Sequence, residues 1–129
     1  MMEAYRQAYA HFGADGRYFT KDGRRFDYQD GMGPYEYLMG ALCGCFCSTL
    51  EDELALAGVA VQTIDAHAYG KKRESVPTTL EDTWIELRIH ASRSDEERIM
   101  DAVGQACRHC SMYQTIACVS RMHVSCEVI

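Results

Sequence analysis

The sequence lacks an excess of basic residues. Lys and Arg number 13 against 19 Asp and Glu, which gives a formal net charge of −6 at pH 7. Proteins that bind nucleic acid along its phosphates carry the opposite sign of charge, so we expect no nucleic-acid partner. The chain also has only 2 Pro and no repeat or low-complexity tract, while 47% of its residues are hydrophobic. This composition is typical of a folded chain, and 129 residues suffice for a single domain over residues 1–129.

A long apolar run and a secretory signal are missing as well. The longest uncharged run, Tyr37 to Leu50, has 14 residues, whereas a membrane-spanning helix needs roughly 17 to 25. The first residues, Met1 to Gln7, contain no basic region followed by an apolar stretch, so we predict no signal peptide. We therefore expect a cytoplasmic protein without a membrane partner.

Cysteine is unusually abundant. The odd number, 7, leaves at least one thiol unpaired. In a reducing compartment, such cysteines are more plausible as buried apolar residues with one or two reactive or metal-binding thiols than as a disulfide framework. The seven are Cys43, Cys45, Cys47, Cys107, Cys110, Cys118 and Cys126.

The first half of the chain reads as three strands followed by a long helix. Two Asp-Gly dipeptides, at residues 15–16 and 22–23, supply the positive φ that tight hairpin turns need. The Pro and Gly residues of 31–34 then end the sheet and allow a helix to start, and Gly58 offers its C-terminal cap. The predicted strands cover residues 4–13, 17–21 and 24–29, and the predicted helix covers residues 34–57.

The second half alternates between strands and a helix. Residues 83–91 show strict period-two alternation, which is typical of a half-buried strand. Residues 94–97, Ser-Asp-Glu-Glu, read as a capping box that starts a helix. The predictions are strands at 59–69, 83–91 and 118–128 and a helix at 95–109. The order βββ-α-ββ-α-β indicates an α+β domain.

The three cysteines of the long helix do not share one face. At 100° per residue, Cys43 and Cys47 lie on the same face while Cys45 points about 200° away from each. Thiols that diverge in this way cannot converge on one metal ion. We expect Cys43 and Cys47 to fill the core and Cys45 to differ from them.

The pair Cys107-x-x-Cys110 falls at the end of the second helix. There the negative end of the helix dipole disfavours a thiolate, so neither thiol is expected to be the attacking nucleophile, although either could resolve a disulfide. A zinc set of Cys45, Cys107, His109 and Cys110 is a weaker alternative. No Ser/His/Asp or nucleotide-binding pattern is present, and we expect no cofactor and no metal.

Two segments together resemble a known family. The run from Pro34 to Phe46, PYEYLMGALCGCF, is similar to the core signature of the OsmC/Ohr family (osmotically inducible protein C and organic hydroperoxide resistance protein). In that signature a reactive Cys follows eleven residues after the Pro, and Cys45 holds this place. The run from Arg108 to Ile116, RHCSMYQTI, resembles the second motif of the family, in which Cys110 takes the place of the second Cys.

This resemblance implies an OsmC-like fold with a long buried central helix, an intertwined homodimer and a thiol peroxidase activity. Cys45 would attack an organic or fatty-acid hydroperoxide, and Cys110 would resolve the resulting sulfenic acid as a disulfide. A cellular dithiol, such as a lipoylated protein, would then reduce the disulfide. The family activates its reactive Cys with a Glu and an Arg, and Glu36 is the matching carboxylate. In the sequence alone, Glu36 reads equally well as a first-turn helix carboxylate.

The chain departs from the family pattern in places that bear on activity. Ala14 stands where the hydroperoxide-resistance branch has its Arg, and Ser111 stands where Pro usually follows the second Cys. Candidate replacement cations are Arg17, Arg24 and Arg25, and the further thiols Cys43, Cys47 and Cys107 could compete as resolvers. The alternative function is a ligand-binding or redox-sensing protein on the same scaffold.

Overall fold

The computed structural model describes residues 5–21, 24–25 and 33–129. It contains three strands, a long helix, two strands, two shorter helices and a last strand. The elements are β1 (Tyr5–Gly13), β2 (Gly16–Lys21), β3 (Arg24–Arg25), α1 (Pro34–Leu56), β4 (Thr63–Lys72), β5 (Leu80–His90), a 3-10 turn (Arg93–Asp95), α2 (Glu96–His109), α3 (Ser111–Ala117) and β6 (Arg121–Val128). The α+β prediction and the order βββ-α-ββ-α-β are thus confirmed, with α3 as an additional helix before the last strand.

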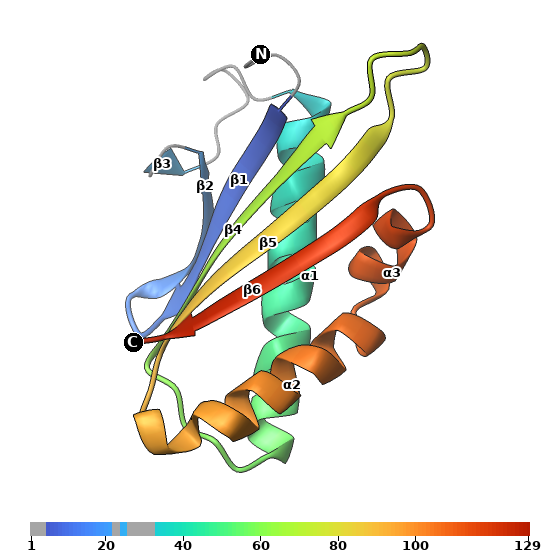
Figure 1. Cartoon of the computed structure of the whole chain (residues 1–129). Helices are drawn as coiled ribbons and strands as arrows, with labels where there is room; N and C mark the ends of the chain where they lie inside the picture. Colours follow the sequence, from blue (N-terminus) through green and yellow to red (C-terminus); the bar gives the residue numbers. More distant parts are fainter. Residues whose placement is uncertain (1–4, 22–23, 26–32) are drawn as a thin grey trace.

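The strands form one six-stranded sheet in the order β3-β2-β1-β4-β5-β6. Neighbouring strands are antiparallel except β5 and β6, which are parallel. A parallel pair needs a long crossover, and α2 and α3 provide it. All three helices lie on the same side of the sheet, with α1 running along its length (Figure 1).

The sheet and α1 enclose the core because strand side chains alternate between the two faces. On β5, Ile85, Leu87 and Ile89 are buried on the helix side. From α1, Met39 and Phe46 are fully buried in the same core. Each such side chain contributes roughly 1.5–3 kcal/mol through burial. Nine residues of α1 are buried, as expected for the long central helix.

The helix α1 begins and ends as its sequence predicts. Pro34 occupies the first helical turn, and a carboxylate oxygen of Glu36 accepts a hydrogen bond from the Gly33 backbone N–H at 2.8 Å. After the C-cap residue Ala57, Gly58 adopts a φ of +71°, a conformation that glycine adopts without the strain a side chain would cause.

The first hairpin differs in detail from its prediction. Gly13 pairs with Gly16, so the loop is formed by Ala14 and Asp15, and Gly16 follows it with a φ of +133°. The positive φ is therefore provided just after the loop, where β2 begins. The second predicted turn, at 22–23, and the end of the predicted strand 24–29 lie outside the described residues.

The predicted capping box at residues 94–97 is wrong. The chain first forms the 3-10 turn, which is capped by the Ser92 hydroxyl accepting a hydrogen bond from the Ser94 N–H at 3.3 Å. The N-cap of α2 is Asp95, and its side chain makes no capping bond. Ser94 is thus held in the 3-10 turn before α2 begins and is not available as its N-cap.

Three strand boundaries also shift. The strands begin at Thr63, Leu80 and Arg121 instead of residues 59, 83 and 118. The last shift has a clear cause, because Cys118 ends α3 and its N–H donates to Thr115. Among the described residues, no helix combines the length and apolar character needed to cross a membrane.

Candidate active site

The helix α1 separates its three cysteines as the helical spacing predicts. Cys43 and Cys47 are fully buried in the core, whereas Cys45 is only partly buried. Burial raises the pKa of Cys43 to about 12 and raises that of Cys47 well above its usual value. The Cys43 thiol also donates to the Ala8 backbone oxygen at 3.6 Å. Both buried thiols are therefore held in their neutral, unreactive form, which leaves Cys45 as the accessible one.

Cys110 sits at the junction of α2 and α3. It ends the first of these helices and is the N-cap of the second, where its sulfur accepts a hydrogen bond from the Tyr113 N–H at 3.4 Å. This junction packs against α1, so the Cys110 thiol donates to the sulfur of Cys45, with 3.4 Å between the two sulfur atoms. The structure thus brings together two thiols that are 65 residues apart in the sequence.

The two thiols differ in their electrostatic surroundings. Partial burial opposes ionisation of Cys45, but hydrogen bonds from the Met112 backbone N–H, from Cys110 and from Ser111 together lower the pKa of Cys45. The Ser111 hydroxyl lies 3.8 Å from the Cys45 sulfur. Cys110 is fully buried, and burial raises its pKa to about 11. One member of the pair is therefore favoured as the thiolate and the other as the thiol.

Two groups beside Cys45, the Ser111 hydroxyl and the Met112 N–H, were not predicted to lie there. Ser111 and Met112 lie in the first turn of α3, a helix that was not predicted. The spacing of Met112, Tyr113 and Ile116 at i, i+1 and i+4 was the available signal, because it places these apolar side chains on one helical face.

Glu36 is not brought to Cys45 within one chain. Both residues lie in α1, nine positions apart, which corresponds to about 13 Å along a helix. A carboxylate oxygen of Glu36 accepts a hydrogen bond from the Gly33 N–H at the start of the helix. The candidate cations lie in β2 (Arg17) and β3 (Arg24 and Arg25), and their side chains are outside the described part of the structure.

The remaining members of the suggested zinc set do not form a metal site. His109 lies 3.4 Å from a carboxylate oxygen of Glu53, on α1. Cys107 is half-buried, and burial raises the pKa of its thiol. Within residues 5–21, 24–25 and 33–129, no three His, Cys, Asp or Glu side chains are arranged to hold a metal ion.

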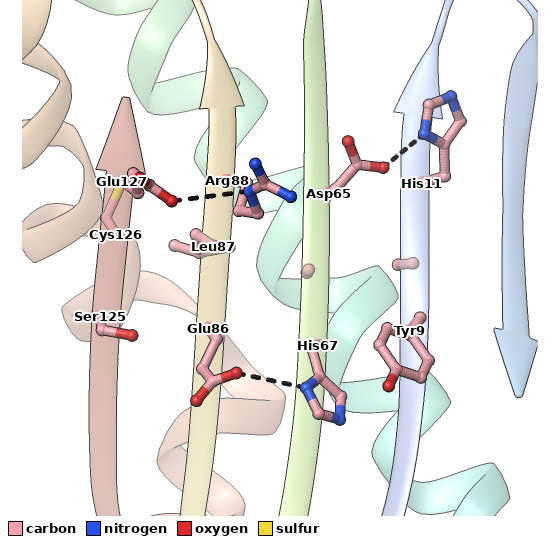
Figure 2. A pocket seen from close by; sticks show the side chains of 12 residues that line it. Tyr9, His11, Asp65, His67, Glu86, Leu87, Arg88, Ser125, Cys126 and Glu127 are labelled. Carbon is pink, nitrogen blue, oxygen red and sulfur yellow. Dashed lines mark hydrogen bonds and ion pairs between the residues drawn. The ribbon is translucent and has the colours of Figure 1, made fainter. Parts of the chain in front are cut away.

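An open groove of about 660 Å³ lies elsewhere, over the sheet. Figure 2 shows its labelled side chains standing on four neighbouring strands. Its charged side chains form pairs across the strands. His11 contacts Asp65 at 2.5 Å, and His67 contacts Glu86 at 3.3 Å. Tyr9 stacks on His67 with ring centres 4.1 Å apart. Neither Cys45 nor Cys110 lines this groove, so it is separate from the thiol pair.

Comparison with known proteins adds a family match. Residues 27–125 match the sequence model of a family described as OsmC-like protein. The matched segment contains both Cys45 and Cys110. No curated protein sequence matches the chain.

Solved structures share the fold at low sequence identity. An OsmC-like protein from Mycoplasma pneumoniae aligns with a TM-score of 0.70 and 14% identity, over 94% of this chain and 95% of that one. A hypothetical protein from Aquifex aeolicus VF5 aligns with a TM-score of 0.69 and 19% identity, over 90% and 83% of the two chains. An OsmC-like hydroperoxide resistance protein from Jannaschia sp. CCS1 aligns with a TM-score of 0.60 and 14% identity, over 88% and 87%.

Proposed function

Because this chain belongs to the OsmC-like protein family, we propose that it is a cysteine-based peroxidase that reduces organic hydroperoxides. The observation that carries the proposal is the contact between the two sulfurs, 3.4 Å apart, with the lowered pKa on Cys45 and the raised pKa on Cys110. A peroxidase of this type needs one thiolate to attack and one neighbouring thiol to resolve.

The chemistry starts at Cys45. Its thiolate attacks the terminal oxygen of the hydroperoxide, the O–O bond breaks, and the alkoxide takes a proton and leaves as an alcohol. Cys45 is then a sulfenic acid. Cys110 attacks that sulfur, a disulfide forms and water leaves. An external dithiol, which we propose to be a cellular one such as a lipoylated protein, returns two electrons by thiol–disulfide exchange.

The geometry favours the resolving step. A disulfide bond is about 2.05 Å long, so the two sulfurs must approach by only about 1.4 Å from their observed contact. The Tyr113 N–H holds the Cys110 sulfur, and Ser111 lies beside the Cys45 sulfur, so both atoms are positioned before the reaction. The description of the Jannaschia protein with this fold as a hydroperoxide resistance protein supports the same class of substrate.

We assign Cys45 as the attacking thiol, Cys110 as the resolving thiol and Glu36 as the activating carboxylate of the partner subunit in a homodimer. The distance along α1 excludes the Glu36 of the same chain as a direct contact to Cys45. Ala41 and Ser48 of α1 are exposed in the single chain, on the side of the central helix that the sheet does not cover. Packing of two such helices would cover this side and bring a second set of side chains near the thiol pair.

The test is steady-state reduction of cumene hydroperoxide with excess dithiothreitol. The unmodified protein should turn over many times, and Cys45→Ser should stop turnover. Cys43→Ser is the matched control, since its thiol lies in the same helix, two residues away, but is buried. Equal losses in both variants would contradict the assignment of Cys45. A single oxidation that then stops, with reductant still present, would indicate a redox sensor instead.

A further inference from the structure

A third thiol lies one helical turn from the resolving one. Cys107 and Cys110 are separated by two helical residues, and the Cys110 N–H still donates to the Ala106 oxygen at 2.9 Å. Helical geometry places Cα atoms three residues apart at a distance of about 5 Å. This lies within the range of roughly 4.4–6.8 Å that a disulfide can bridge.

We propose that Cys107 attacks the Cys45–Cys110 disulfide and takes Cys110 as its new partner, so that the disulfide moves to Cys107–Cys110 and Cys45 is released. The proposal rests on the proposed peroxidase function, because the hydroperoxide supplies the oxidation. In this step the Cys107–Cys110 S–S bond forms and the Cys45–Cys110 S–S bond breaks. Cys45 leaves as a thiolate, the proton of Cys107 passes to solvent, and no net oxidation or reduction occurs.

One residue, Tyr113, affects both thiols of the new pair. Its backbone N–H donates to the Cys110 sulfur at 3.4 Å, and the influence of its hydroxyl on the Cys107 thiol opposes the rise in the pKa of Cys107 that burial causes. Cys110 is fully buried, so a thiol from within the chain has access to its sulfur that an external reductant lacks.

The surroundings of the three thiols set the direction of the exchange. In thiol–disulfide exchange, the thiol with the lower pKa leaves more readily. The pKa of Cys45 is lowered, whereas burial raises the pKa of Cys107. Cys45 is thus a better leaving group than Cys107. At equilibrium the disulfide therefore joins the two thiols with the raised pKa values, Cys107 and Cys110.

The decisive experiment identifies the disulfide in the oxidised protein. Cys118→Ser serves as the background, because Cys118 is an exposed thiol that would share a tryptic peptide with Cys110. One sample is oxidised with one equivalent of cumene hydroperoxide and a second with diamide, a thiol oxidant that needs no peroxidase activity. Free thiols are then alkylated, and the protein is cleaved with trypsin, which cuts after Arg108 between the two cysteines.

The expected product in both samples is a cross-link between peptides 99–108 and 109–121, with Cys45 alkylated. Stable linkage of 109–121 to the peptide of Cys45, with Cys107 alkylated, overturns the proposal. If cumene hydroperoxide leaves all thiols reduced while diamide gives the Cys107 linkage, the peroxidase function fails and with it the exchange, and only the preference of Cys110 for Cys107 as its disulfide partner stands.

Stoichiometry gives a second readout. Without a reductant, release of Cys45 allows a second hydroperoxide to react, so each chain of unmodified protein should form two equivalents of alcohol. Cys107→Ser and Cys107→Ala should each form one. Two equivalents in both variants would contradict the exchange, and the linkage experiment remains decisive if either variant does not fold, because it leaves Cys107 intact.

Discussion

Removal of the Cys110 thiol should raise the pKa of Cys45. In Cys110→Ala, the Cys45 thiolate loses the S–H donor that lies 3.4 Å away. A hydrogen bond to a charged group is worth about 1.5–3 kcal/mol net. Since Cys45 is partly exposed, water replaces part of this bond, and we expect a loss of about 1 kcal/mol. At 1.36 kcal/mol per pKa unit, the pKa of Cys45 rises by about 0.7, which lowers its thiolate fraction near pH 7 about fivefold.

The assay is the rate of iodoacetamide alkylation of Cys45 as a function of pH, followed by tandem mass spectrometry of the tryptic peptide 26–71, which distinguishes Cys45 from Cys43 and Cys47. Cys110→Ser is the matched control, because its hydroxyl keeps a donor for Cys45 and an acceptor for the Tyr113 N–H. The Ala variant also loses the cap of α3, at a cost of about 1 kcal/mol in stability. An unchanged pKa of Cys45 in Cys110→Ala, or an equal rise in both variants, refutes the role of the thiol donor.

Three further changes test the structure around the site. Phe46→Ala should lower the free energy of unfolding by about 3–5 kcal/mol in urea titration, since the ring is fully buried, and a loss below 1 kcal/mol would contradict its place in the core. Hydrogen bonds to Asp65 and Asp15 raise the pKa of His11 above 6.5, so its stabilising contribution is complete below that pH and is lost as the pH rises through the raised value. His11→Asn should therefore flatten the melting temperature against pH above 6.5, and an unchanged slope would contradict the pairing. Glu36→Ala should lower the free energy of unfolding by about 1 kcal/mol, because it loses the hydrogen bond at the start of the helix. Glu36→Gln should keep the stability but slow peroxide consumption. If Glu36→Gln keeps the full rate, Glu36 only caps the helix.

Periodicity was sufficient to predict most of the fold. The alternation of residues 83–91 is a local pattern, and β5 follows it. The rotation of 100° per residue along a helix likewise predicts that Cys45 faces away from Cys43 and Cys47. In the structure Cys43 and Cys47 are buried and Cys45 is partly exposed. The helix at 95–109 was predicted to within one residue, but its capping box was wrong, because a capping box and a 3-10 turn use the same residue types and tertiary context decides between them.

The site was less accessible to sequence reasoning. That Cys45 and Cys110 meet depends on how α3 packs against α1, and no local pattern encodes a contact over 65 residues. As the last residue after α2 alone, Cys110 lies at the negative end of a helix dipole, which disfavours a thiolate. In the structure the same residue also starts α3, whose first turn supplies the Met112 N–H that lowers the pKa of Cys45.

The position of Cys110 between two helices links oxidation to resistance against unfolding. A Cys45–Cys110 disulfide would tie the central helix to the α2–α3 junction and close a loop between residues 65 positions apart. Loss of chain entropy in the unfolded state then stabilises the oxidised protein by about 4 kcal/mol. A Cys107–Cys110 disulfide closes a loop of one helical turn and gives up most of this gain. The melting temperature of the oxidised protein therefore shows which thiol is bonded to Cys110: it is higher for the Cys45–Cys110 disulfide than for the Cys107–Cys110 disulfide.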